Sequence, residues 1–590
     1  MKRLFSLAVL ITIVGSCSTD KTTAPAMTFD EMLDQYYEEG LKLNPLNATF
    51  AGDPRYNDLF PDFLSDEYNE EVKAYSNKYL ELITQYDDTQ LTADQLLSKE
   101  IVRWECEMTL KDMEFKKDLT PIDQMWSNNL MIGQLASGQS AQPFETVEDY
   151  EKWLKRIDGY LVWLNSAKEK MKDGIEQNYV LPKSLIVKVI PQLEAMTTED
   201  LEQNLFYSPA KNFPESFTDK EKEELTTKYK EMVLDKVVPA YKDIAEFVKT
   251  DYLAAGRESS GYGVMPNGEA FYQHQIKLYT TTDMTADQIH QLGLDEVARI
   301  SAEMEKVKAQ VGYEGDLVSF FDYVRNNKEL MPFTKPEQVI EYFDGIHETM
   351  KPHLEKLFNN KPKTPFEVRR TEAFREASAS AEYNPGSLDG TRPGIFYTPI
   401  PDVEEYNIYD NESLFLHEAI PGHHYQISLT QENENLPMFR KTLWYSGYGE
   451  GWALYTESLG KELGLYTDPY QYFGMLSAEI HRAIRLVVDT GIHSKGWTRE
   501  EAIQYSVEHE AEPYDGIVRE IERYMANPGQ ALSYKIGQLK IRELRKRAED
   551  QLGDKFDIAA FHDQVLETGC IPLALLETKI DRWIASVKKS

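Results

Sequence analysis

Three of the eleven histidines of this 590-residue chain fall within eight residues, in the stretch LHEAIPGHHYQ. His417 and Glu418 repeat the first half of the H-E-x-x-H pattern, in which two imidazoles bind zinc and the glutamate activates a water molecule. Here the fifth position is Pro421, and the next imidazoles belong to His423 and His424. These residue types predict a divalent-metal site with a carboxylate base, on a helix that departs from the usual spacing.

An unbroken helix could not bring these imidazoles together. A six-residue step rotates by about 240° and rises by about 9 Å, so His417 and His423 would point to different sides. Pro421 removes a backbone donor and Gly422 accepts unusual backbone angles. We therefore expect a break that returns His423, or its neighbour His424, to His417. The alternative is a helix that ends at Pro-Gly and two incidental surface histidines.

A third ligand is predicted in the segment Gly447–Leu463, which reads GYGEGWALYTESLGKEL. Its apolar residues recur at helical spacing, and Glu450 and Glu457 share the face opposite the apolar stripe. Glu450 follows His423 at a distance that allows a turn and a returning antiparallel helix, so we predict Glu450 as the ligand. Glu457 would either orient a ligand histidine or replace Glu450. Otherwise both are solvated glutamates on an outer face.

Two further side chains could act on a substrate. Arg485 lies four residues before Asp489 in a predicted helix, where it either pairs with Asp489 on the surface or binds a peptide carboxylate. Tyr534 follows a turn at the start of a long predicted helix that ends near Leu552. A phenol close to a metal could donate a hydrogen bond to the oxyanion that forms on an attacked carbonyl.

The segment from Glu376 to Pro401 predicts short strands, because small and polar residues alternate before a turn-rich stretch and a β-prone run. Pro393 and Pro399 bound that second run, so we expect it at the edge of a sheet. An edge strand beside a metal helix could hold an extended peptide through main-chain hydrogen bonds, with Tyr397 in contact with the substrate. A structural hairpin is the alternative.

The N-terminus has the pattern of a bacterial lipoprotein signal. Lys2 and Arg3 precede an apolar run too short to span a membrane, and VGSC ends in Cys17. We predict a signal peptide over residues 1–16, and a lipid-modified Cys17 followed by a polar tether over residues 17–28. The protein would contact a membrane through this anchor only, at the periplasmic or cell-surface face. An ordinary signal peptide is the alternative.

The composition excludes one class of partner. The chain has 99 acidic and 64 basic residues and a net charge of -35, so nucleic-acid binding is not expected. Besides Cys17, only Cys106 and Cys570 remain, which allows one disulfide and no cysteine zinc knuckle. Amphipathic stripes, such as the one from Trp153 to Met171, predict a mainly helical protein.

Several motifs together resemble a known family. LHEAIPGHHYQ, GEGWALYTE, NPGQALSYKIG, DGTRPGIFYTP and FHDQVLETGCIPLALLE are similar to motifs of the bacterial "domain of unknown function 885" family, over the whole chain from about residue 29. The resemblance implies kinship with gluzincin-like metallopeptidases, such as angiotensin-converting enzyme, thimet oligopeptidase and the carboxypeptidase Taq family. It thus implies a mainly α, two-lobed zincin-like clam-shell over residues 29–590, with a small edge β-sheet beside the active-site helix.

The same resemblance implies site residues. His417, His423 and Glu450 would bind one Zn²⁺, Glu418 would be the general base, and Tyr534 would stabilise the oxyanion. We therefore expect a zinc metallopeptidase that hydrolyses short peptides. Two alternatives are a non-catalytic, surface-anchored lipoprotein that binds nutrients and a degenerate zincin that binds metal without hydrolysis. Two imidazoles and a carboxylate also suit other divalent ions.

Overall fold

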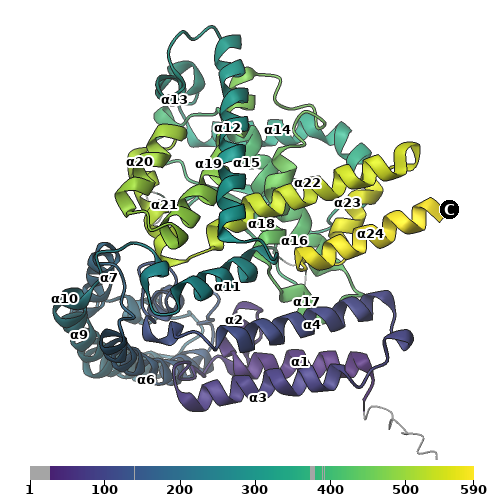
Figure 1. The fold of residues 1–590 in the computed structure, drawn as a ribbon. Coiled ribbons are helices and arrows are strands. Elements are labelled where there is room, and N and C mark those ends of the chain that lie inside the picture. The colour runs from purple at the N-terminus through teal and green to yellow at the C-terminus, as the bar shows by residue number, and fades with distance from the viewer. Residues whose placement is uncertain are drawn as a thin grey trace, which may run out of the picture.

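The computed structural model describes residues 27–589 apart from 139, 373–375, 377–378, 389 and 391. The predicted signal peptide, Cys17 and nearly all of the tether lie outside the described residues. Most of the described chain is helical, as the sequence predicts, and its strands form one small sheet (Figure 1). None of the described helices has the length and apolar character that crossing a membrane requires.

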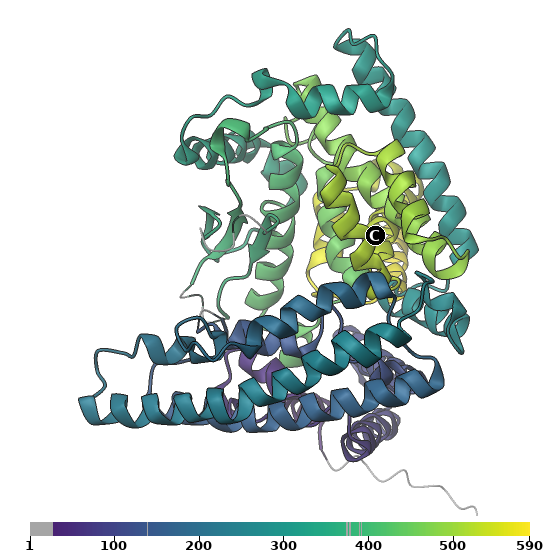
Figure 2. The same cartoon turned by 90° about the vertical axis from the view of Figure 1, so that its left-hand side faces the viewer.

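The N-terminal helices lie together in the lower part of Figures 1 and 2. The stripe predicted from Trp153 to Met171 is confirmed, because both residues and the residues at helical spacing between them are buried on one long helix. The helices of this part are α1 (Phe29–Leu43), α2 (Pro45–Phe50), α3 (Asp66–Ile83), α4 (Ala93–Asp112), α5 (Asn128–Ala136), α6 (Val147–Gln177), α7 (Lys183–Glu194), α8 (Asp219–Glu231), α9 (Val238–Phe247) and α10 (Leu253–Ala255).

The remaining helices lie above them and carry the predicted site. They are α11 (Gly268–Thr280), α12 (Ala286–Gln310), α13 (Leu317–Asn326), α14 (Pro336–Leu357), α15 (Asn411–Glu418), α16 (His423–Glu432), α17 (Met438–Thr442), α18 (Ser446–Glu457), α19 (Pro469–Ser494), α20 (Arg499–His509), α21 (Tyr514–Ala526), α22 (Ser533–Leu552), α23 (Ile558–Leu566) and α24 (Leu573–Lys589).

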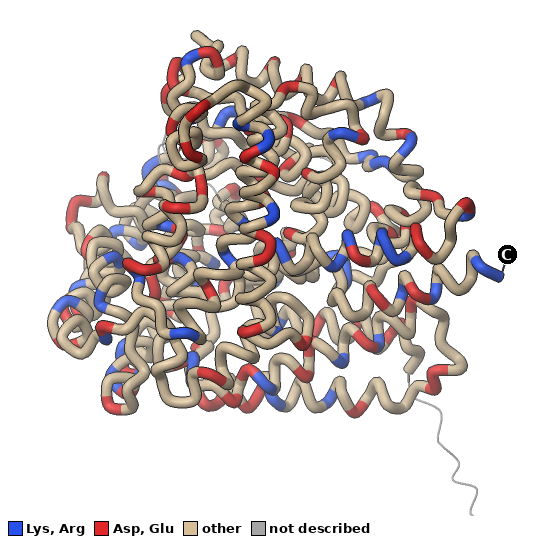
Figure 3. The backbone as a smooth tube through the Cα atoms, turned by 45° about the horizontal axis from the view of Figure 1, so that its top comes forward, with Lys and Arg blue, Asp and Glu red and all other residues tan. Residues whose placement is uncertain are grey.

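Two large apolar clusters hold these helices together. The smaller one joins α6, α7 and α9. The larger one joins α1, α3 and α4 to the helices from α12 to α24, so the N-terminal helices pack directly on the part that carries the site. The ring of Tyr36 on α1, for example, meets the ring of Phe439 on α17 edge to face at 5.4 Å. Acidic and basic residues are interspersed over the described chain (Figure 3).

The sheet contains β1 (Phe366–Arg370), β2 (Glu382–Asn384) and β3 (Gly394–Thr398), in the order β1-β3-β2. The predicted edge position of the third strand is wrong: β3 is central, parallel to β1 and antiparallel to β2. Pro393 and Pro399 lie just outside β3, so neither removes a donor from the ladder. The ring of Phe366 lies 5.0 Å from that of His424, which places the sheet beside α16.

Tertiary packing excludes two possibilities that the sequence left open. The predicted helix over residues 447–463 ends at Glu457, and it has no solvated face, since Leu454 and Glu457 are both buried. Cys106 and Cys570 are buried free thiols rather than a disulfide. Of the possible roles for Glu457, a solvated surface position is therefore excluded.

Candidate metal centre

The helix break predicted at Pro-Gly is confirmed. α15 ends at Glu418 and α16 begins at His423, with Pro421 and Gly422 in the connection. A Cβ atom on residue 422 would collide with the carbonyl oxygen of His417, so glycine is what lets the connection turn across the end of α15. Because the break interrupts the helical hydrogen bonds, the carbonyl group of Pro421 needs another donor. The indole Nε1 of Trp452 on α18 supplies it at 2.9 Å.

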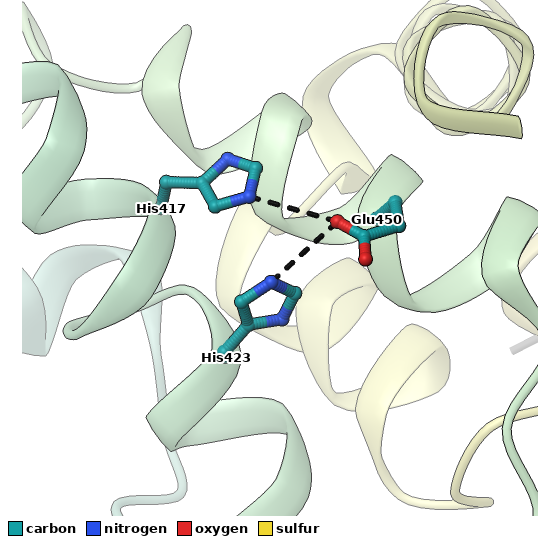
Figure 4. A group of neighbouring side chains, drawn as sticks. All are labelled: His417, His423 and Glu450. Carbon is teal, nitrogen blue, oxygen red and sulfur yellow. Dashed lines mark ion pairs between the residues drawn. The ribbon is translucent and has the colours of Figure 1, made fainter. Parts of the chain in front are cut away.

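The break brings His417 and His423 to a common partner on α18. The Nε2 atom of each imidazole lies 3.6 Å from the same Oε2 atom of Glu450, and Figure 4 shows both rings pointing toward this carboxylate. A separation of 3.6 Å is too long for a hydrogen bond. It is close to the roughly 3.3 Å that separates two ligands of a tetrahedral zinc ion with bonds near 2.0–2.1 Å. The spacing therefore suits a metal ligand set, and the donor types fit zinc.

Glu457 holds one of these histidines. Its Oε1 atom lies 2.6 Å from Nδ1 of His417, and its Oε2 atom accepts a hydrogen bond from Ser413 at 2.7 Å. A carboxylate on Nδ1 fixes the tautomer of an imidazole and leaves Nε2 free to bind a metal. Glu450 thus faces Nε2 of both imidazoles at a spacing that suits a ligand, and Glu457 holds His417 from its Nδ1 side.

His424 faces away from this cluster. Its Nδ1 atom lies 2.9 Å from the hydroxyl group of Tyr383 on β2 and 3.3 Å from that of Ser428. Burial lowers the pKa of His424 to about 4, so the ring is neutral at physiological pH. The choice between the two adjacent histidines, which the sequence leaves open, falls on His423.

Charges within the cluster offset the cost of burial. Burial lowers the pKa of His417, but the neighbouring carboxylates of Glu450 and Glu457 outweigh it and raise the pKa to about 9. Burial alone would raise the pKa of Glu450, whereas His417 and His423 hold it well below its ordinary range. The described residues thus form a compact set with two nitrogen donors and one ionised oxygen donor, all within 4.8 Å of one another.

Glu418 ends α15 directly after His417. Burial raises its pKa, while the charges of His417 and His423 act in the opposite direction, so its carboxylate lies within electrostatic reach of both rings. Among the described residues, Glu418 has neither a hydrogen-bond nor an ion-pair partner. A carboxylate with a raised pKa and free acceptors beside two metal-ligand candidates is suited to proton transfer.

A close crossing of α18 and α22 brings Tyr534 to the cluster. A Cβ atom on Gly451 would lie only 2.5 Å from Cα of Gly537, so both glycines are needed for this approach. Tyr534 lies one turn before Gly537. Burial raises the pKa of Tyr534, and the charge of Glu450 raises it further, which places the phenol near the cluster.

Arg485 supports that phenol from α19. Its guanidinium carbon lies 4.5 Å from the centre of the Tyr534 ring, and its Nε atom donates a hydrogen bond to Tyr524 at 2.9 Å. The possible surface pair with Asp489 is wrong. Asp489 is fully buried and accepts a hydrogen bond from Tyr272 at 2.6 Å, because each side chain finds partners on other helices.

Tyr397 lies elsewhere. It lines a cavity of about 590 Å³ between the sheet and helices α5 and α7, and none of His417, His423 and Glu450 lines that cavity. Trp444, a neighbour of the cluster, was not predicted from the sequence. The ring of Trp444 lies 5.8 Å from that of His423, although the side chain is 45% exposed. The only sequence feature that could have indicated its role is its position just before the GYGEGW motif.

Comparisons with known proteins show the family and give no activity. Residues 45–580 match the family described as "Bacterial protein of unknown function (DUF885)". Two similar solved structures are described as putative lipoproteins. The one from Colwellia psychrerythraea is 29% identical, with a TM-score of 0.85 over 95% of this chain and 99% of its own. The one from Shewanella oneidensis, of unknown function, is 19% identical, with a TM-score of 0.75 over 94% and 99%, and shows the fold alone. Among curated proteins, none matches this chain.

Proposed function

The chain belongs to the DUF885 family of bacterial proteins, and we propose that this member is a zinc-dependent peptidase of gluzincin-like, two-lobed architecture. The observation that carries the proposal is the pair of imidazole Nε2 atoms, each 3.6 Å from one oxygen of Glu450. Two imidazoles and a carboxylate are the ligand set of catalytic zinc sites that keep a position open for water. Glu418 beside them adds the base that hydrolysis needs.

His417, His423 and Glu450 would hold the ion, and Glu457 would keep His417 in the binding tautomer. When bound, Zn²⁺ acts as a Lewis acid and lowers the pKa of a water ligand toward about 7. A single ion accounts for the three donors. Glu457, which orients His417, is itself held by a hydrogen bond from the hydroxyl group of Ser413.

The protein groups around the ion would divide the remaining chemistry. Glu418 takes the proton from the attacking water as the oxygen–carbon bond forms, and returns it to the leaving nitrogen as the peptide bond breaks. The phenol of Tyr534 donates a hydrogen bond to the oxyanion that develops on the scissile carbonyl. Arg485, stacked on the Tyr534 ring, holds that phenol in position and gives the site positive charge.

The substrate would be a short peptide, by analogy with enzymes of the clam-shell architecture. The net charge of -35 argues against nucleic acid. The lipid anchor at Cys17 would hold the enzyme at the periplasmic or cell-surface face of a membrane, and the description of the similar Colwellia psychrerythraea protein as a putative lipoprotein supports such an anchor. Tyr397 remains a candidate substrate contact on β3.

The metal is tested by elemental analysis of the purified protein after equilibration with zinc and removal of the excess. We expect about one zinc per chain, and less than about a tenth of that in His417→Ala and His423→Ala. His424→Gln is the matched control and should retain the zinc, because its ring faces Tyr383. Zinc binding that survives both alanine variants would contradict the proposed site.

Catalysis is tested with Glu418→Gln on a library of short peptides. This variant should keep its zinc and lose about 10²- to 10⁴-fold in kcat, the usual contribution of a general acid–base group. Stoichiometric zinc without hydrolysis by the unmodified protein would instead identify a degenerate zincin. Peptide or glycan binding without any zinc would identify a nutrient-binding lipoprotein.

A further inference from the structure

A groove of about 660 Å³ separates the N-terminal helices from α16 and α17, which Figure 1 shows lying above α1 and α4. Tyr36 on α1, Tyr75 on α3 and Glu105 on α4 line its lower wall. Gln426 on α16 and the exposed Trp444 line the opposite wall. Carboxylate, amide and aromatic groups therefore meet in one concave surface, as in sites that bind small molecules or peptides.

This groove approaches the metal cluster at Trp444, although none of His417, His423 and Glu450 lines it. Trp444 belongs to both, because it lines the groove and its ring lies 5.8 Å from that of His423. The thiol of Cys570 also lines the groove. Burial raises the pKa of this thiol to about 12, with smaller contributions from the carboxylates of both Glu450 and Glu105. Cys570 thus lies close enough to feel the charges of both Glu450, in the cluster, and Glu105, in the groove.

Glu105 has unused capacity for a cation. Its carboxylate accepts one hydrogen bond, from the hydroxyl group of Tyr445 at 2.6 Å, and forms no ion pair with any described residue. An ionised carboxylate can accept about four hydrogen bonds, so the partly buried carboxylate of Glu105 has acceptor capacity that the described residues leave unused. Burial raises the pKa of Glu105. A positively charged ligand would supply what the protein does not.

The buried carboxylate of Glu479 has partners of a different kind from those of Glu105. Glu479 is 4% exposed, and its Oε1 atom accepts hydrogen bonds from Lys535 and Arg299, both at 2.7 Å. Two cations thus offset the negative charge of Glu479. Glu105 lines an open groove and lacks such a partner, which is typical of a side chain kept for a ligand.

The aromatic residues around Glu105 suit the same kind of ligand. The rings of Tyr36 and Tyr75 stack at 5.4 Å between centroids, and both line the groove. Aromatic faces attract ammonium and guanidinium groups. The Oε1 atom of Gln426, buried without a hydrogen-bond partner among the described residues, could accept an N–H group of a peptide backbone.

We propose that this groove binds the substrate peptide and that Glu105, with the rings of Tyr36 and Tyr75, binds a positively charged group of that peptide. The inference rests on the proposed function in taking a peptide as the ligand. The charged group is either the ammonium of the peptide N-terminus or a lysine or arginine side chain, since both present a cation to a carboxylate and to aromatic rings that line the same groove. Positive charge on the substrate thus contributes to specificity.

The test is calorimetric binding to the zinc-loaded Glu418→Gln protein, which should not cleave the peptide. Three pentapeptides share a neutral sequence: one has a free N-terminus, one is N-acetylated, and one is N-acetylated with a single lysine. Binding is compared between this protein and versions that also carry Glu105→Gln or Glu107→Gln. Glu107 is an exposed residue of the same helix and serves as the matched control.

We expect one charged peptide to bind about 10- to 100-fold more tightly than the neutral one, and Glu105→Gln to remove that difference. The charged peptide that loses affinity in Glu105→Gln shows whether Glu105 binds the N-terminal ammonium or the lysine side chain. Glu107→Gln should change no affinity. If the Glu105→Gln variant fails to fold, the three peptides can still be compared on the protein that retains Glu105, so the test remains valid.

Equal binding of charged and neutral peptides would overturn the inference, and so would an equal loss of affinity for all three peptides in Glu105→Gln. Failure of all three peptides to bind would overturn it as well. Hydrolysis by the unmodified protein is measured in parallel. Charge-dependent binding without hydrolysis would contradict the proposed peptidase activity but support peptide binding in the groove. Hydrolysis without charge dependence would contradict only the proposed role of Glu105.

Discussion

His417 in the cluster and Glu105 in the groove differ in how far protein partners hold their side chains in place. In the cluster, Glu457 holds His417, and Glu450 faces both imidazoles. In the groove, Glu105 has one hydrogen bond, and the Oε1 atom of Gln426 has none among the described residues. A catalytic centre must be held in one geometry before the substrate arrives. A recognition surface gains affinity from groups that the protein has left unpaired.

Gly422→Ala should have the largest effect, because it disrupts the cluster without touching the groove. The added Cβ atom collides with the backbone of α15, so we expect stability to fall by about 3 kcal/mol and zinc binding to be lost. Urea denaturation and elemental analysis measure the two effects. Gly345→Ala on α14 meets no atom within 4 Å and should be neutral or stabilising by about 0.5–1 kcal/mol. Equal results for both variants would contradict the role of Gly422.

Tyr534→Phe should separate catalysis from binding. Removal of one oxyanion donor costs about 100-fold in kcat, while KM and zinc content stay near their original values. Steady-state kinetics on a cleaved peptide measure the change. Tyr514→Phe is the control, since that side chain is 61% exposed. An unchanged kcat in Tyr534→Phe would remove the phenol from the proposed mechanism.

Glu457→Gln should weaken the metal site while its shape persists. The neutral amide can still accept from Nδ1 of His417, but without the negative charge we expect zinc affinity to fall by about 10- to 100-fold. Competition with a chelating dye measures this affinity. Glu462→Gln, a change in a partly exposed ion pair with Arg545, should leave it unchanged. If Glu457→Gln instead binds zinc as tightly as the unmodified protein, Glu457 is not an orienting group.

Trp444→Ala should have the smallest effect, and it tests whether the groove binds peptide independently of zinc binding in the cluster. Loss of an aromatic wall should weaken peptide binding by about 5- to 10-fold, equivalent to about 1–1.4 kcal/mol, without loss of zinc. Trp126→Ala, which removes an exposed tryptophan from a different cavity, is the control. Similar binding by the two variants would show that the peptide does not use this groove.

The sequence predicted the features that depend on neighbouring residues. The buried stripe from Trp153 to Met171 lies on one helix, as its spacing predicted. The Pro-Gly break lies where the backbone preferences of Pro421 and Gly422 place it. The edge position of β3 and the possible pair of Arg485 with Asp489 were wrong, because the partners of these residues come from distant segments.

The sequence by itself determined the kinds of donor in the cluster and the break between His417 and His423, because proline and glycine act on the backbone wherever they stand. Only the tertiary structure decided that Glu450 faces the imidazoles while Glu457 lies behind one of them. That choice depends on where α18 lies against α15, where the hydroxyl group of Thr456 donates to the Leu416 carbonyl at 2.8 Å. Such contacts join residues far apart in the chain, and local sequence preferences do not specify them.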